Sequence, residues 1–128
     1  MKFNWLICLC LLSWLSVAQA DYAGVWTQEM AVSAAQDSKV LLLDVRSEQE
    51  FASGRVPGAK NIPYDELEAR LSELRAYSDK TIVLYCHSGR RASIAESYLS
   101  ANGFTQLYHL QGDMQAWSAK GLAQERSN

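Results

Sequence analysis

Two short apolar runs, each leading to a polar side chain, constrain the fold of this chain most strongly. Residues 40–43 are Val-Leu-Leu-Leu and lead to Asp44, and residues 81–85 are Thr-Ile-Val-Leu-Tyr and lead to Cys86. Continuous runs of this length and composition are typical of strands that are buried on both faces, as the strands of parallel sheets are. Parallel strands need crossover connections, which are usually helices. The two runs therefore predict an α/β fold.

The segments around these runs supply the rest of that fold. Three further strand-like segments lie at residues 23–26, 60–62 and 106–110. Capping signals or helical spacing occur at residues 27–34, 91–102 and 113–120, and in a segment that starts at residue 64 or 65 and carries Leu67, Leu71 and Leu74 on one face. This alternation predicts a mostly parallel, roughly five-stranded sheet with helices on both faces.

Residues 1–20 differ from the rest of the chain and are predicted to be a signal peptide. Lys2 provides a positive start, residues 5–12 form an apolar run, and residues 18–20, Ala-Gln-Ala, have the small-x-small pattern that signal peptidases cleave. Cleavage there leaves residues 21–128 as the mature chain, and a chain of that length suits one compact domain.

A retained membrane anchor is the alternative use of the N-terminal segment. Residues 3–17 are shorter than the roughly 20 apolar residues that a spanning helix needs, and Ser13 and Ser16 interrupt them. We therefore expect an exported protein, periplasmic if its source is a Gram-negative bacterium, with no membrane association after cleavage.

Charge and cysteine content narrow the function classes. The chain carries 12 basic and 14 acidic residues, and Lys2 is lost with the signal. A slightly acidic mature chain argues against nucleic acid or an anionic membrane as a partner. Cys8 and Cys10 lie in the predicted signal, so Cys86 would be the sole cysteine of the mature chain. A lone thiol in an oxidising compartment points to a function, with an inert buried thiol as the alternative.

The segment that follows Cys86 joins a predicted strand to a predicted helix. Ligands of open α/β sheets gather at such carboxyl ends of strands. Backbone N–H groups of the loop can converge on the sulfur, and the helix N-terminus adds partial positive charge. Gly89 can take the positive φ that such a loop requires. We therefore expect Cys86 to be a nucleophile that is favoured as a thiolate.

Four other residues of this loop are candidate substrate ligands. Arg90 and Arg91 are adjacent guanidinium groups at the start of the predicted helix, where they can hold a sulfonate or a similar anion. His87 and Ser88 can donate hydrogen bonds to an oxyanion, or they can simply face solvent. With Gly89, these residues form the predicted anion-binding loop around Cys86.

Three segments, in the same order along the chain, are similar to motifs of the rhodanese family. The first spans residues 44–63 and contains Asp-Val-Arg, Glu-Phe, Gly-Arg-Val-Pro-Gly-Ala and Asn-Ile-Pro. The second is the loop that starts at Cys86. The third is residues 110–117, Leu-Gln-Gly-Asp-Met-Gln-Ala-Trp. The resemblance covers nearly all of the mature chain and implies a rhodanese-like fold.

Two positions depart from the family pattern. Arg55 stands where the family usually has histidine, and Asp113 stands where a second glycine is common. We expect neither residue to touch the nucleophile. The other motif side chains are expected to be structural, with Asp44, Arg46 and Glu50 in a polar network between a strand end and the next helix, and Trp117 in the core.

The resemblance implies a sulfurtransferase that works in two steps. The thiolate of Cys86 attacks the outer sulfur of thiosulfate and releases sulfite, and the resulting persulfide passes its sulfur to cyanide or a thiol. A protein is a further possible sulfur acceptor. The cycle needs no metal or organic cofactor, and the basic loop suits the anionic substrates.

Two other function classes remain open. Phosphatases and arsenate reductases of related fold place five residues between cysteine and arginine, whereas Arg91 follows Cys86 after only four and Ala92 stands in the next position. Hydrolysis of an aryl phosphate would identify that class. A persulfide carrier or binding module without turnover is the other alternative, because one fold can host several functions.

Overall fold

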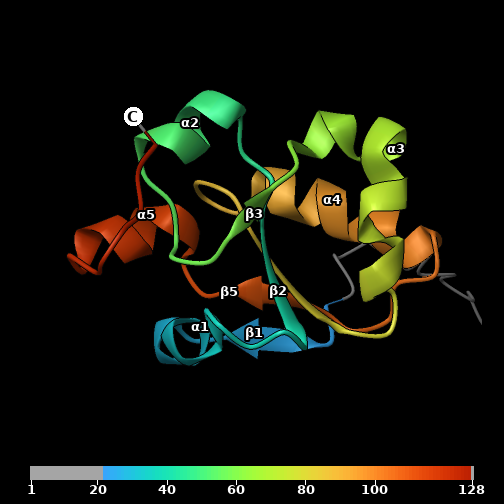
Figure 1. The fold of residues 1–128 in the computed structure, drawn as a ribbon, viewed down its shortest axis with the longest axis horizontal. Coiled ribbons are helices and arrows are strands. Elements are labelled where there is room, and N and C mark those ends of the chain that lie inside the picture. The colour runs from blue at the N-terminus through green and yellow to red at the C-terminus, as the bar shows by residue number, and fades with distance from the viewer. Residues whose placement is uncertain (1–21, 128) are drawn as a thin grey trace, which may run out of the picture.

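Five parallel strands form the centre of the structure, a computed structural model that describes residues 22–127 (Figure 1). Their order across the sheet is β1-β5-β4-β2-β3, and every pairing between neighbours is parallel. The strands are β1 Gly24–Trp26, β2 Val40–Asp44, β3 Lys60–Asn61, β4 Thr81–Tyr85 and β5 Leu107–Leu110. The predicted α/β fold with a five-stranded sheet is confirmed.

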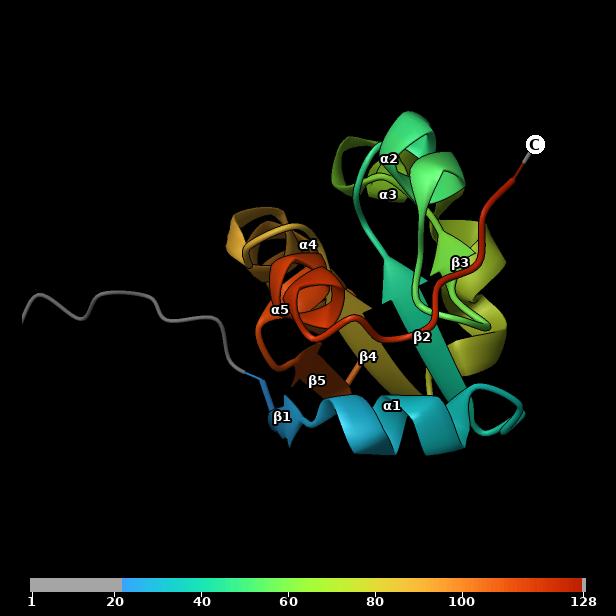
Figure 2. The ribbon, with the colours of Figure 1, turned by 90° about the vertical axis from the view of Figure 1, so that its left-hand side faces the viewer.

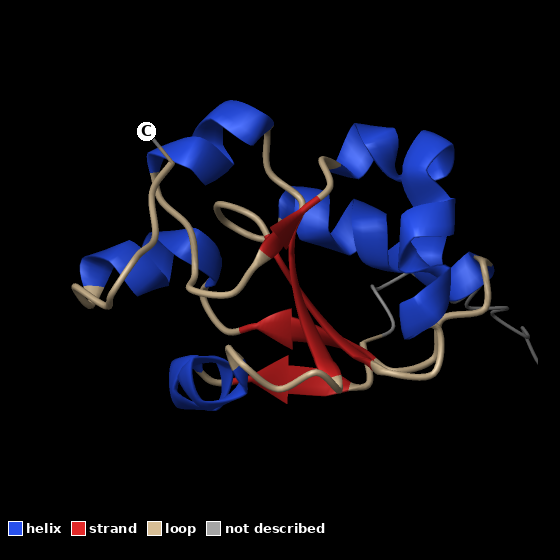
Figure 3. Cartoon of the chain, viewed as in Figure 1, coloured by secondary structure: helices blue, strands red, loops and turns tan. Residues whose placement is uncertain are grey.

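Helices cover the sheet and connect its strands (Figure 3). The α-helices are α1 Gln28–Ala34, α2 Glu48–Ser53, α3 Leu67–Arg70, α4 Arg90–Ala101 and α5 Asp113–Ala119. Two 3-10 segments, η1 Tyr64–Glu66 and η2 Leu71–Tyr77, flank α3. Among the described residues, no helix is long and apolar enough to span a membrane. The predicted signal peptide, residues 1–20, lies outside the described residues.

Alternation along the central strands divides the core between the two faces of the sheet. Leu43 and Leu84 belong to a cluster that includes Leu67 and Leu74 from the η1–η2 region and Leu99 from α4. On the opposite face, side chains of β2 and β4 pack with α1 and α5, in a cluster of Leu42, Val83, Tyr85, Ala31, Met114 and Trp117. Successive strand residues point to opposite faces, so both faces of β2 and β4 are buried.

Helix α1 begins as the sequence predicts, and α2 has a complete capping box. Thr27 is the N-cap of α1, and its side chain accepts a hydrogen bond from the Met30 N–H. Ser47 caps α2 by accepting from the Glu50 N–H, and the Glu50 carboxylate accepts in return from the Ser47 N–H. This reciprocal cap fixes α2 just beyond the carboxyl end of β2 (Figure 2).

The segment that carries Leu67, Leu71 and Leu74 is not the regular helix that we predicted. It is an α-helical turn between η1 and η2. Leu71, Leu74 and Tyr77 recur every three residues, which places them on one side of a 3-10 helix with three residues per turn. The apolar contacts that the leucine spacing predicts are still made, since Leu67 and Leu74 are buried.

Candidate active site

Cys86 follows directly after β4, the central strand of the sheet, and its side chain is 1% exposed. The backbone N–H of Gly89 donates a hydrogen bond of 3.0 Å to the Cys86 Sγ. Gly89 has φ 113°, a conformation that favours glycine. The chain therefore brings its cysteine and a backbone donor together within one four-residue loop.

Helix α4 begins immediately after this loop. Gly89 is its N-cap, and the Gly89 carbonyl accepts from the Ser93 N–H at 3.0 Å. The positive end of a 12-residue helix thus lies beside the loop that holds Sγ. Such a helix end stabilises negative charge, and the amide of Gly89 adds a direct hydrogen bond. Both features place positive electrostatic potential beside the Cys86 sulfur.

The first residues of α5 hold the loop from its other side. The Met114 N–H donates to the Cys86 carbonyl at 3.0 Å, and the Gln115 N–H donates to the His87 carbonyl at 3.1 Å. The Asp113 Oδ1 accepts from the Cys86 N–H at 3.0 Å. Our expectation that position 113 does not touch the nucleophile is therefore wrong, because the start of α5 packs directly against residues 86 and 87.

The two arginines of the loop have different surroundings. Arg91 forms two hydrogen bonds with the Glu50 carboxylate, at 2.7 and 3.0 Å. This bidentate contact lowers the pKa of Glu50 to about 2. Arg90, the first residue of α4, is exposed. Because the Arg91 guanidinium is engaged by Glu50, Arg90 is the arginine of the pair that is better placed to meet an anion from solvent.

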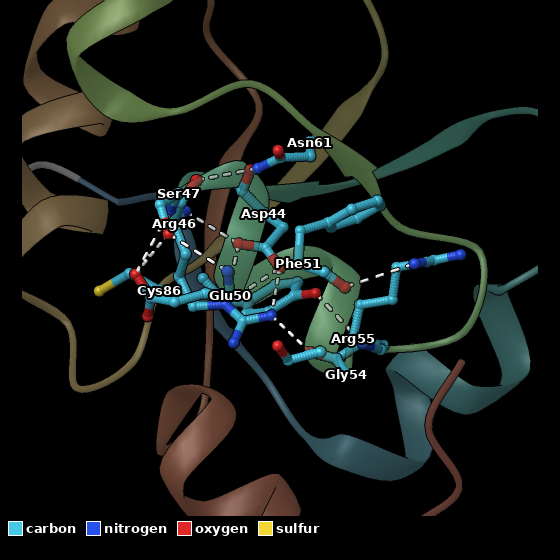
Figure 4. Close-up of polar contacts among 12 residues, drawn as sticks. Asp44, Arg46, Ser47, Glu50, Phe51, Gly54, Arg55, Asn61 and Cys86 are labelled. Atoms are coloured by element: carbon cyan, nitrogen blue, oxygen red, sulfur yellow. Dashed lines mark hydrogen bonds and ion pairs between the residues drawn. The ribbon is translucent and has the colours of Figure 1, made fainter. Parts of the chain in front are cut away.

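The residues of the predicted polar network form two contacts, of which Figure 4 shows the one around Arg46. Arg46 pairs with Asp44 at 2.7 Å, and both residues are buried. The Arg46 Nη2 also donates to the Gly54 carbonyl, which ties the end of β2 to the end of α2. The hydrogen bonds of Glu50 run to Ser47, in the cap of α2, and to Arg91 of α4. The predicted pairing is confirmed for Asp44 and Arg46, whereas Glu50 connects α2 to α4.

A polar hollow of about 430 Å³ lies beside the cysteine loop. Its lining comes from the segment after β2, from α2 and its C-cap, from the cysteine loop, from α5 and from the C-terminal segment. The lining residues are Arg46, Gln49, Glu50, Ser53, Gly54, His87, Met114, Ser118 and Gln124. His87 and Ser88 are both exposed, and His87 is the predicted ligand that reaches this hollow. The two charged groups in the lining, Arg46 and Glu50, are each paired inside the protein.

Sequence reasoning missed several of these residues. Gln49, Ser118 and Gln124 come from three separate parts of the chain, and nothing in their local sequence indicates a shared hollow. Asp113 did carry a signal, since it replaces a glycine of the family motif. Among residues 22–127, no cluster of three or more His, Cys, Asp or Glu side chains is placed to hold a metal ion.

The fold and the cysteine loop together define a class of protein. In this class of α/β protein, a cysteine lies at the carboxyl end of a central parallel strand. Its sulfur accepts a hydrogen bond from a backbone N–H and lies beside the N-terminus of a helix. The Rhodanese-like domain family matches residues 27–120. The chain belongs to this family.

Similar proteins agree with that assignment. A protein named as a sulfurtransferase from Allochromatium vinosum is 33% identical over 96 residues, which cover 75% of this chain and 88% of the relative. An uncharacterized protein, YqhL, from Bacillus subtilis is 40% identical over 82 residues, 64% of either chain, so this chain spans just under two thirds of that relative.

One solved structure extends the comparison to the fold. The crystal structure of thiosulfate sulfurtransferase from Pseudomonas aeruginosa matches with a TM-score of 0.72 and 26% identity, over 81% of this chain and 20% of that one. The family match and these relatives support a sulfurtransferase-type function.

Proposed function

We propose that this protein transfers a sulfane sulfur from thiosulfate to a thiophilic acceptor through a persulfide on Cys86. The Gly89 N–H at 3.0 Å from Sγ is the observation that carries the proposal, because it stabilises negative charge on sulfur. Membership of a sulfurtransferase-containing family supports the same chemistry.

The proposed first step transfers sulfur from donor to cysteine. The Cys86 thiolate attacks the outer sulfur of thiosulfate, a new S–S bond forms, and the bond between the two thiosulfate sulfurs breaks. Sulfite leaves with the electron pair of that bond. The terminal sulfur of the Cys86 persulfide then carries the negative charge, and the positive end of α4 beside the loop stabilises it.

The proposed second step regenerates the enzyme. A nucleophile such as cyanide or a thiolate attacks the terminal sulfur of the persulfide, and the Cys86 thiolate leaves with the electron pair of the S–S bond. The products are thiocyanate or a new persulfide. A protein thiol is a further acceptor that we propose, and the polar hollow beside His87 is where an acceptor would approach.

Thiosulfate treatment of the purified protein tests both steps. Trypsin releases residues 81–90 as one peptide with Cys86 as its only cysteine, so this peptide reports on Cys86 alone. We expect a mass gain of about 32 Da on the peptide, loss of that mass with cyanide, and release of thiocyanate. Cys86→Ser, which replaces the thiol by a hydroxyl on a side chain of the same shape, should show none of these changes.

Absence of the mass gain from a folded, reduced protein would overturn the thiosulfate proposal. A protein persulfide should then be offered as the donor, because a carrier would accept sulfur from it. Hydrolysis of an aryl phosphate, lost in Cys86→Ser, would indicate phosphatase chemistry instead. We further propose export with cleavage after Ala20, which N-terminal sequencing of the protein recovered from its source would test.

A further inference from the structure

Asp113 has an unusual position for an acidic residue. Its side chain is 2% exposed, and it is the only non-glycine residue with a positive φ, 54°, among residues 22–127. Most residues with a side chain are strained at positive φ, and aspartate and asparagine are strained less than the others. Glycine, which is common at this position in the family, is not strained there. Asp113 is therefore both buried and held in a mildly strained backbone conformation.

The carboxylate of Asp113 has two hydrogen-bond partners at the active-site loop. Its Oδ1 accepts from the Cys86 N–H at 3.0 Å. It also lies 2.9 Å from the His109 Nε2, so the imidazole carries its proton on Nε2 when it donates to the ionised carboxylate. The His109 ring is stacked against Tyr22, with ring centroids 5.2 Å apart. In that tautomer the stacked His109 ring orients the carboxylate.

The consequence for Cys86 is that its main chain is held at both ends by α5. The Asp113 carboxylate holds the Cys86 N–H, and the Met114 N–H holds the Cys86 carbonyl. Sγ projects from this clamped residue toward the Gly89 N–H. Asp113 also lies against Gly89, because a Cβ built on Gly89 would be 3.3 Å from the Asp113 Oδ2.

We propose that Asp113 is a positioning residue for sulfur transfer, which clamps the Cys86 amide so that Sγ stays against the Gly89 N–H. This role rests on the proposed function, in which Sγ must hold negative charge twice in each cycle. It does not require Asp113 to touch the substrate. The acceptor oxygen is the feature that matters, and the negative charge of the carboxylate is not required.

Two substitutions at position 113 separate these contributions. Asp113→Asn keeps a side-chain oxygen for the Cys86 N–H but removes the charge. Asp113→Gly removes the oxygen and the charge and also relieves the backbone strain at φ 54°. The full-length protein would be compared in all three forms by two rates: alkylation of Cys86 by iodoacetamide and persulfidation by thiosulfate. Both rates are read on the tryptic peptide 81–90.

We expect Asp113→Gly to lower both rates about tenfold, the scale of one lost hydrogen bond near a charged group. Asp113→Asn should keep both rates within about threefold of the wild type, because a neutral amide oxygen still accepts from the Cys86 N–H. The melting temperature of each variant is measured alongside, and the rates are taken well below it. A purely structural role would change the melting temperature and leave the rates of the folded protein unaltered.

Three outcomes overturn the proposal. The first is unchanged rates in Asp113→Gly, and the second is an equal decrease of the rates in both variants. The third is an equal increase in both variants, which would mean that the charge alone matters. Alkylation does not involve thiosulfate. A wild-type protein that is alkylated but never persulfidated therefore contradicts the proposed function, while the alkylation rates still decide the role of Asp113.

Discussion

Glu50 and Arg91 lie 41 residues apart in the sequence, yet they join α2 to the first turn of α4 beside the cysteine loop. The pKa of Glu50 is lowered to about 2, chiefly by its hydrogen bond with Arg91. In the unfolded chain this carboxyl titrates near its ordinary pKa of 4.5. The pair therefore stabilises the fold fully above pH 4.5, and its contribution is lost as the pH falls toward 2.

We predict that Glu50→Gln lowers the free energy of unfolding at pH 7 by about 0.5–1 kcal/mol, a modest value because the pair is partly exposed to solvent. The difference from the wild type should shrink between pH 4.5 and pH 2. Urea titrations at several pH values measure it. Glu48→Gln, on the same turn of α2 but exposed, serves as the control. A Glu50→Gln effect that is independent of pH would contradict the ion pair.

Arg90 is the residue at which an effect on substrate binding is expected. Its side chain is exposed at the start of α4, next to the loop that holds Cys86. We predict that Arg90→Ala raises the KM for thiosulfate about two- to fivefold at low salt and less at high salt, since the contribution of an exposed charge is small and screened. Arg126→Ala, which removes an exposed charge near the C-terminus, should leave KM unchanged. Equal effects of both variants would indicate net charge alone.

At the scale of single residues, the sequence predicted Cys86 and its loop as the candidate site but did not predict which residues hold them in place. Cys86 and Gly89 could be placed because the loop is local, spanning four residues between a strand and a helix. The pairing of Arg91 with Glu50 could not, because it depends on how α2 and α4 pack. Asp113 was misjudged for the same reason, since its contact with Cys86 spans 27 residues.

The secondary-structure elements vary in how well local signals specify them. The central strands β2 and β4 have the bounds expected from their apolar runs, because burial on both faces leaves a continuous pattern. Helix α1 follows from its Thr27 cap. The region between Tyr64 and Tyr77 was predicted as one helix, because leucines spaced three and four residues apart fit an α-helix and a 3-10 helix alike over so few turns.

Helix α2 depends on its cap more than a longer helix would. It has six residues and buries none of its side chains, so packing contributes little to its stability. We predict that Ser47→Ala, which removes the capping oxygen, lowers the free energy of unfolding by about 1 kcal/mol. Amides of α2 should also lose protection from hydrogen exchange.

The matched control for the cap is Ser53→Ala, at the other end of α2. The Ser53 hydroxyl is exposed and bonds the Gln49 carbonyl of its own helix. Its removal should change stability by less than about 0.5 kcal/mol. Unchanged exchange protection of α2 in Ser47→Ala would show that contacts of the Glu50 side chain, and not the cap, hold this helix in place.

Across the whole molecule, β4 links the two halves of the core and carries the site at its end. Leu84 and Tyr85 are adjacent, yet Leu84 belongs to the cluster beneath α4 and Tyr85 to the cluster that contains Trp117. Both side chains are fully buried. Because these two clusters share the central strands, the domain is expected to unfold as one cooperative unit.

The last prediction tests whether the two faces of the sheet unfold together. Leu84→Ala leaves a cavity on the α4 face and should lower the free energy of unfolding by about 2–5 kcal/mol. NMR-monitored urea titration would follow the indole N–H of Trp117, which lies on the opposite face and donates to the Ala123 carbonyl at 2.9 Å. Its transition should shift together with that of the α4 amides. Ile94→Ala, at a side chain that is 43% exposed, should cost less than about 0.5 kcal/mol. Separate transitions for the two faces would mean that the sheet does not couple their unfolding. The cysteine loop is held by α4 on one face and by α5 on the other, so it would then open before the whole domain unfolds.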